Sequence, residues 1–127
     1  MAAGRDLADH RRMPRRLELT DDGLALSFTG FLRLLTLRRR LVVPWSAVRD
    51  VRAGAYEGGA VHGRFRRSGR WQFLSFEDPQ RVVRLHLDRR ARGAQGFDEV
   101  VVGDRDPSRL AAAIADRAGL NPAARAA

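Results

Sequence analysis

One stretch near the C-terminal end has the residue spacing of an amphipathic helix. Leu110 and Ile114 lie four residues apart with alanines on the neighbouring rows, so one narrow face is apolar. Asp106 suits the N-cap, Pro107 suits the first helical position, and Gly119 suits the left-handed residue that ends a helix. The pattern predicts a helix over residues 106–120, with Leu110 and Ile114 closing one end of the core.

Before this helix, short segments alternate between apolar and polar residues, which is typical of half-buried strands. The clearest pair is residues 17–20 and 24–28, joined by the turn sequence Asp21-Asp22-Gly23, and it predicts a hairpin. Residues 32–43 are predicted to form one bent strand or two short ones, because their apolar positions change phase. Further strands are predicted at residues 48–53, 70–76, 81–88 and 97–102.

Two internal segments lack strand alternation. Residues 44–47 predict a bend or a single helical turn, with Trp45 in the core and its indole nitrogen bonded to a nearby carbonyl. Residues 54–69 contain five glycines, and no long element is predicted there.

These elements predict one mainly β domain over residues 16–120. It follows a flexible basic tail at residues 1–15 and precedes a frayed end at residues 121–127. About seven antiparallel strands with short connections favour a meander that curls into a partly open barrel, capped by the C-terminal helix.

Composition narrows the chemistry. The chain has no cysteine, which excludes disulfides, thiolate zinc sites and cysteine nucleophiles. His10, His62 and His86 have no partner at a catalytic or metal-binding spacing, and each is interpreted as a solvated side chain. No phosphate-cradling loop or nucleophile elbow is present. The prediction is a protein without enzymatic activity, metal or cofactor.

The charge is concentrated in the middle of the chain. All 24 basic residues are arginines, and residues 31–70 hold ten of them against two acids. An ordinary solvated surface is the preferred interpretation, and the alternative is a face that binds anions. Seven arginines are the candidate contacts of that alternative: Arg38, Arg39, Arg40, Arg64, Arg66, Arg67 and Arg70.

Three segments resemble the bacterial pleckstrin-homology-like domains, in particular their small single-domain actinobacterial forms. These segments are residues 17–24 (LELTDDGL), 42–51 (VVPWSAVRDV) and 106–110 (DPSRL). The resemblance runs from about Arg16 to Leu120 and implies two nearly orthogonal antiparallel sheets of seven strands, capped by the helix. In eukaryotic relatives that bind phosphoinositides, the first strand–strand loop is basic. Here that loop is Asp21-Asp22-Gly23, so this lipid mode is not expected.

The predicted fold and the resemblance to pleckstrin-homology-like domains lead us to expect a protein that binds a partner. The first hypothesis is an interaction module that binds a protein partner through a sheet edge or an end loop. The alternative is peripheral binding of an anionic membrane surface or of nucleic acid through the arginine-rich centre, residues 31–70. A third possibility is a carrier with a small molecule inside the barrel, although no small-molecule substrate is expected. A cytoplasmic location is predicted, with or without membrane attachment.

Overall fold

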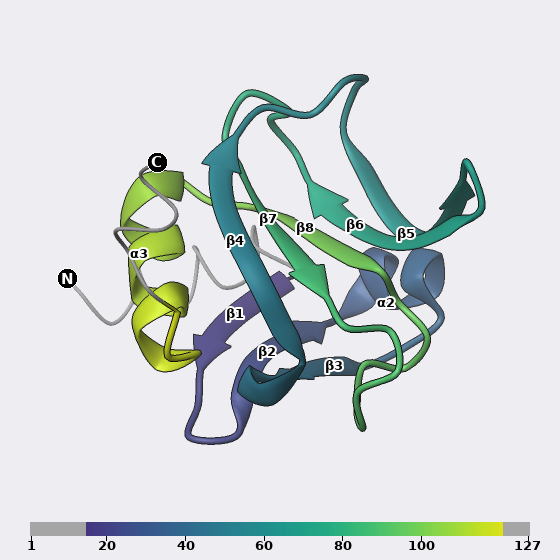
Figure 1. Cartoon of the computed structure of the whole chain (residues 1–127). Coiled ribbons are helices and arrows are strands. Elements are labelled where there is room, and N and C mark those ends of the chain that lie inside the picture. The colour runs from purple at the N-terminus through teal and green to yellow at the C-terminus, as the bar shows by residue number, and fades with distance from the viewer. Residues whose placement is uncertain (1–14, 121–127) are drawn as a thin grey trace, which may run out of the picture.

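The computed structural model describes residues 15–120, and they form two open β-sheets with a helix at each of two opposite sides (Figure 1). The three-stranded sheet has the order β1-β2-β3, with β1 (Arg15–Leu19), β2 (Gly23–Phe28) and β3 (Arg40–Pro44). The five-stranded sheet has the order β4-β7-β8-β6-β5, with β4 (Val48–Gly54), β5 (Val61–Arg67), β6 (Arg70–Phe76), β7 (Val82–Leu87) and β8 (Glu99–Gly103). The helices are α2 (Gly30–Thr36), the 3-10 turn η1 (Trp45–Ala47) and α3 (Pro107–Arg117).

The predicted N-terminal hairpin is confirmed. β1 and β2 pair antiparallel from Leu19↔Leu24 outward. The hydroxyl of Thr20 donates to the Gly23 carbonyl at 2.9 Å and accepts from the Gly23 amide at 3.1 Å, so it holds the turn. Gly23 is required for a steric reason, because a Cβ there would lie 2.1 Å from the Val43 carbonyl oxygen of β3. The predicted helical turn at residues 44–47 is η1.

The prediction of strand structure throughout residues 32–43 was wrong in its first half. Residues 30–36 form α2, and only β3 is extended. Leucine has a high helix propensity, whereas the β-branched valines that favour strands are confined to residues 42–43. Leu32 and Thr36 lie four residues apart and are both 5% exposed, and the Thr36 hydroxyl donates to the Leu32 carbonyl at 2.7 Å.

The prediction that residues 54–69 hold no long element was also wrong. β5 occupies half of this segment and pairs antiparallel with β6 along its whole length. Gly63 lies within the strand opposite Leu74, where a missing side chain does not interrupt pairing. Ser68 and Gly69 have φ angles of +52° and +77°, as a tight two-residue hairpin turn requires, and this turn fixes the register.

The strands do not form the predicted seven-stranded meander. There are eight strands among residues 15–120, and β8 enters the sheet between β7 and β6. It pairs antiparallel with β7 but parallel with β6. A central strand is covered on both faces, which explains the continuous apolar run Val100-Val101-Val102. The two sheets stay open rather than closing into a barrel.

The core lies between the two sheets, and α3 covers one of its sides against β4 (Figure 1). The predicted C-terminal helix is confirmed, and the Asp106 carboxylate caps it by accepting from the Arg109 amide at 3.2 Å. Leu110 is 9% exposed and Ile114 is fully buried. Trp45 packs on the rim of the core, and its Nε1 donates to the Thr20 carbonyl at 2.9 Å. No helix within residues 15–120 has the length and apolar character needed to span a membrane.

Arg15 joins the two sheets rather than belonging to a solvated tail. Its guanidinium donates to the carbonyls of Ser75 and Gly103, at 2.7 and 2.6 Å, where the parallel strands β6 and β8 end. Burial lowers the pKa of Arg15, and the charges of Asp104 and Glu77 oppose that shift. The remaining tail, residues 1–14, and the C-terminal end, residues 121–127, lie outside the described residues.

The position of Ile114 leads to a stability prediction. We expect Ile114→Asp to unfold the domain, because the new carboxylate would be buried without a partner. Ile114→Ala should stay folded but melt roughly 10 °C lower, through the lost packing. Ala112→Asp is the matched control, because it places the same charge on the exposed face of α3. Circular dichroism melts of the three variants measure this, and an Ile114→Asp variant as stable as the control would contradict it.

Candidate functional site

The arginines predicted from the sequence divide between two faces of the five-stranded sheet. Arg64 and Arg66 project from β5 on the core-side face, where their guanidinium carbons lie 4.3 and 5.7 Å from the centre of the Trp71 ring. Arg67 and Arg70 flank the β5–β6 turn and line a groove on the outer face. The single arginine-rich centre of the sequence is therefore two separate sites in space.

Arg38 approaches the core-side arginines from the segment between α2 and β3. Its Nη1 donates to Gln95 Oε1 at 3.0 Å, and its guanidinium lies 5.5 Å from the ring centres of both Phe73 and Phe97. Burial and, to a smaller degree, the charge of Arg64 lower the pKa of Arg38. These cations border a small pocket of about 130 Å³, which is lined by Arg64, Trp71, Arg89, Gln95, Gly96 and Phe97.

Leu37 is the most exposed large apolar residue among the side chains that the structure describes, which within residues 15–120 leave out positions 31, 34 and 35. Its side chain is 89% exposed, and its backbone has a φ of +56° at the end of α2, where glycine is the usual residue. Arg33 precedes it by one helical turn and is exposed, as are Arg39 and Arg40 that follow it. α2 lies beside β5, so these residues come from α2 and the segment that follows it, close to the strand that carries the core-side arginines (Figure 1). We call the following set the basic end: Arg33, Leu37, Arg38, Arg39, Arg40, Arg64 and Arg66.

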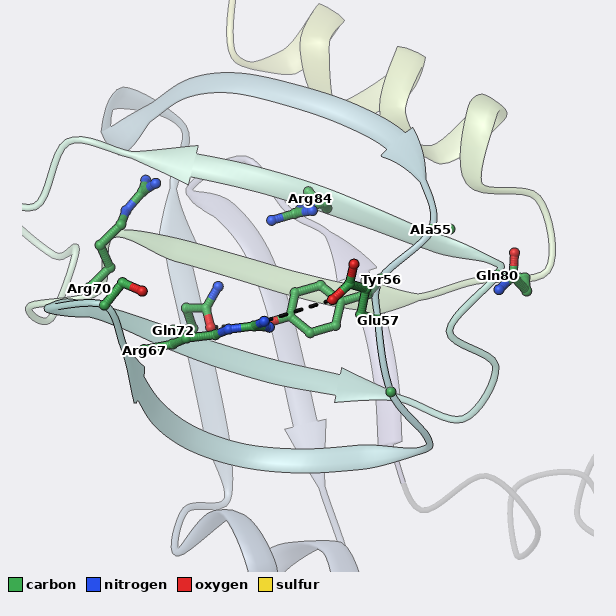
Figure 2. A pocket seen from close by; sticks show the side chains of 10 residues that line it. Ala55, Tyr56, Glu57, Arg67, Arg70, Gln72, Gln80 and Arg84 are labelled. Carbon is green, nitrogen blue, oxygen red and sulfur yellow. Dashed lines mark hydrogen bonds and ion pairs between the residues drawn. The ribbon is translucent and has the colours of Figure 1, made fainter.

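A groove of about 710 Å³ lies on the outer face of the five-stranded sheet (Figure 2). The loop after β4 forms one wall and the β5–β6 turn forms the other, while Gln72 of β6 and Arg84 of β7 line it from the sheet. We call it the outer groove, and its lining is Ala55, Tyr56, Glu57, Gly58, Arg67, Ser68, Arg70, Gln72, Gln80 and Arg84.

A buried carboxylate organises the sheet beneath this groove. Glu99 is only 2% exposed, and its Oε1 accepts from Gln72 Nε2 at 2.6 Å. Arg84 donates to both Glu99 oxygens, from Nε at 3.1 Å and from Nη2 at 3.2 Å. Tyr56 donates its hydroxyl to Gln72 Oε1 at 3.0 Å, and His86 Nε2 lies 3.4 Å from Glu99. We call these five residues the Glu99 network.

The interpretation of the sequence missed the outer groove and its network. Gln72, Arg84 and Glu99 come from three strands that are distant in the chain, and only the strand order of the folded sheet brings them together. One signal was present: Glu99 begins the apolar run of β8, and a carboxylate beside a buried strand needs a cationic partner. The alternation along β7 puts Arg84 and His86 on the face opposite the buried Val83 and Leu85.

His62 is held between two side chains rather than solvated as predicted. Its Nδ1 lies 2.9 Å from Ser75 Oγ and its Nε2 lies 3.0 Å from Glu77 Oε1. A serine, a histidine and a carboxylate in line have the composition of a hydrolytic triad. Ser75 is nevertheless 0% exposed, so its hydroxyl cannot reach a substrate. Residues 15–120 contain no cluster of three or more histidine and acidic side chains placed to hold a metal ion.

Comparison with known proteins adds no assignment: no family model, no curated protein and no solved structure matches the chain.

The Glu99 network leads to a prediction of energetic coupling. Arg84→Gln and Glu99→Gln should each destabilise the protein, and the double variant should lose about 1–3 kcal/mol less than the sum of the two. The partial exposure of Arg84, whose side chain is 35% accessible, favours the lower part of that range. Urea denaturation of the four proteins gives the coupling. Strictly additive losses would show that the pair is not a stabilising interaction.

Proposed function

We propose that this protein is a non-enzymatic interaction module of the pleckstrin-homology-like class, and that its basic end binds an anionic membrane surface. One observation carries the proposal: Leu37 is held almost fully exposed, on a left-handed backbone, within a group of arginines. Leucine is an uncommon residue at a left-handed helix end, and a binding role for its exposed side chain would account for its presence there. At a membrane, the same side chain enters the acyl boundary while the arginines meet the headgroups.

The magnitudes support an electrostatic attachment with one apolar anchor. Each arginine near an anionic bilayer contributes about 1 kcal/mol, and full burial of a leucine side chain contributes roughly 1.5–3 kcal/mol. The basic end holds six arginines. The pocket beside Arg64 and Arg89 suits a lipid phosphate, since guanidinium groups bind phosphate oxygens through paired hydrogen bonds.

A membrane fits the basic end better than a nucleic acid does. Single-stranded nucleic acid is held by stacking of bases on exposed aromatic rings. Trp71, the aromatic residue described beside Arg64 and Arg66, packs against the core, and Arg64 covers its ring. Leu37 has no role in phosphate binding, whereas it has a direct role in a bilayer.

Two features support the proposals that the protein belongs to the pleckstrin-homology-like class and that it has no catalytic activity. Two sheets followed by a C-terminal helix agree with the architecture that the pleckstrin-homology-like resemblance implies, although the strand count and the parallel pair differ from it. The Ser75, His62 and Glu77 arrangement is closed to substrates because its hydroxyl is buried.

The membrane proposal makes a specific prediction about vesicle binding. The protein should sediment with vesicles that contain phosphatidylglycerol and not with pure phosphatidylcholine, and raising the salt should release it. Arg39→Glu with Arg40→Glu should weaken binding about thirtyfold or more, since two attractive charges become repulsive. Leu37→Ser should weaken it by a smaller factor that salt does not change.

The control variant is Arg105→Glu with Arg109→Glu, which makes the same change in net charge near α3, on the opposite side of the protein (Figure 1). Equal losses in both double variants would mean that net charge alone drives binding. Such a result would contradict a defined membrane-facing end, as would tighter binding to a short nucleic acid than to the anionic vesicles.

The edge of the five-stranded sheet favours a second candidate function, the binding of a protein partner. Among residues 15–120, β5 forms strand pairs only with β6 and α2 lies beside it, so strand addition would use the part of its other edge that α2 leaves open. Four of its residues, Arg64-Phe65-Arg66-Arg67, are exposed, and three of these are basic. An acidic segment in extended conformation is the partner that this edge would accept as an added strand.

Hydrogen exchange tests this second candidate. A peptide of alternating glutamate and valine should slow amide exchange in β5 by about tenfold or more, through new backbone hydrogen bonds. A peptide with lysine in place of glutamate is the control. Unchanged exchange in β5 at saturating acidic peptide would eliminate strand addition at this edge.

A further inference from the structure

We propose that the outer groove is a second binding site, separate from the basic end, for a small phosphorylated molecule that carries hydroxyl groups. The groove has a volume of about 710 Å³, which is within the range of small-molecule sites. It lies on the face of the five-stranded sheet that points away from the three-stranded sheet, so it does not require a ligand within the core.

The charge of the groove identifies the phosphate. Three arginines line it, Arg67, Arg70 and Arg84, against the single carboxylate of Glu57. Arg84 is neutralised by Glu99 beneath it, whereas Arg67 and Arg70 are exposed at the mouth. Figure 2 shows Arg67 pointing along the groove and Arg70 pointing in another direction, so the two exposed side chains would turn toward each other to bind the oxygens of one phosphate group.

The base of the groove is already ordered before a ligand arrives. Two hydrogen bonds hold Tyr56: its hydroxyl donates to Gln72, and its backbone amide donates to the Pro79 carbonyl at 2.7 Å. Its ring also contacts the ring of Phe76. The guanidinium of Arg84 lies 5.1 Å from the centre of the same ring. A preformed site loses little conformational entropy on binding, which favours a small ligand.

In contrast, the mouth of the groove is closed by a weak contact. Arg67 Nη2 lies 3.8 Å from Glu57 Oε2, and these side chains are 61% and 91% exposed (Figure 2). Exposed ion pairs of this kind contribute little to stability. A phosphate can therefore displace Glu57 from Arg67, because it offers the guanidinium more charge and better geometry.

The rest of the lining identifies the body of the ligand. Once displaced, the Glu57 carboxylate can accept hydrogen bonds, and Gln80 and Ser68 can both donate and accept them. Tyr56 is the aromatic residue of this lining, and its ring contacts Phe76 and Arg84 instead of standing open to stack on a base. Hydroxyl groups match this lining, and the ligand class is a sugar phosphate or a similar phosphorylated polyol.

Nuclear magnetic resonance titration tests the proposal with three probes: glucose 6-phosphate, glucose and inorganic phosphate. Glucose 6-phosphate should shift the amide signals of residues 55–58 and 67–72. It should bind at least about tenfold more tightly than either of the other two, because it engages both the arginines and the hydroxyl-binding lining. No shift with glucose 6-phosphate would overturn the site. Equal affinity for inorganic phosphate would overturn the class of ligand.

Paired variants locate the site. Arg67→Gln with Arg70→Gln should weaken glucose 6-phosphate binding roughly tenfold, whereas Arg64→Gln with Arg66→Gln should leave it unchanged. Both variants remove two charges from the same hairpin, but on opposite faces of the sheet. Glu57→Gln should tighten binding two- to fivefold, because the ligand no longer competes for Arg67. Equal losses in the two arginine variants, or weaker binding by Glu57→Gln, would contradict the proposal.

The vesicle assay separates this proposal from the membrane proposal. The Arg64→Gln with Arg66→Gln variant should lose vesicle binding and keep glucose 6-phosphate binding. The Arg67→Gln with Arg70→Gln variant should lose glucose 6-phosphate binding and keep vesicle binding. The experiments can therefore contradict the proposal for one site and still support the proposal for the other.

Discussion

The arrangement of the five-stranded sheet depends on how the carboxylate of Glu99 is accommodated. Glu99 is buried on the central strand β8, and an ion buried without a partner costs several kcal/mol of folding free energy. Arg84 of β7 and Gln72 of β6 satisfy it from both neighbouring strands, and Gln72 in turn orients Tyr56. The contacts of this one carboxylate thus connect β8 to both of its neighbouring strands and also shape the base of the outer groove.

The parts of the fold that follow from local signals were predictable from the sequence. The Asp106 cap with the Leu110 and Ile114 spacing defined α3, and the Asp21-Asp22-Gly23 turn defined the first hairpin. α2 was not predictable from apolar phase, because a leucine-rich segment satisfies helix and strand patterns equally. β5 was hidden by its glycines, and its pairing is specified by the Ser68-Gly69 turn geometry. The parallel pairing of β6 with β8 is a long-range property that no local pattern encodes.

For the candidate sites as well, the sequence showed which residues are present but not which of them the fold brings together. The charge of residues 31–70 was visible in the sequence, and nine of its ten arginines are exposed. What the sequence did not reveal is that β5 separates them: Arg64 and Arg66 join the basic end, while Arg67 and Arg70 join the outer groove. Successive side chains of a strand point to opposite faces of the sheet, so neighbouring arginines of β5 belong to different surfaces. One surface is the basic end with Leu37, and the other is the outer groove above the Glu99 network.

The central claim is that the basic end faces a membrane with Leu37 inserted, and a fluorescent label tests it most directly. The chain contains no cysteine, so Leu37→Cys gives a single labelling position for a polarity-sensitive dye, and Ala112→Cys on the exposed face of α3 gives the comparison. On phosphatidylglycerol vesicles, the account predicts a blue shift of the dye emission at position 37 and none at position 112. Vesicle binding without a shift at position 37, or with equal shifts at both positions, would contradict it.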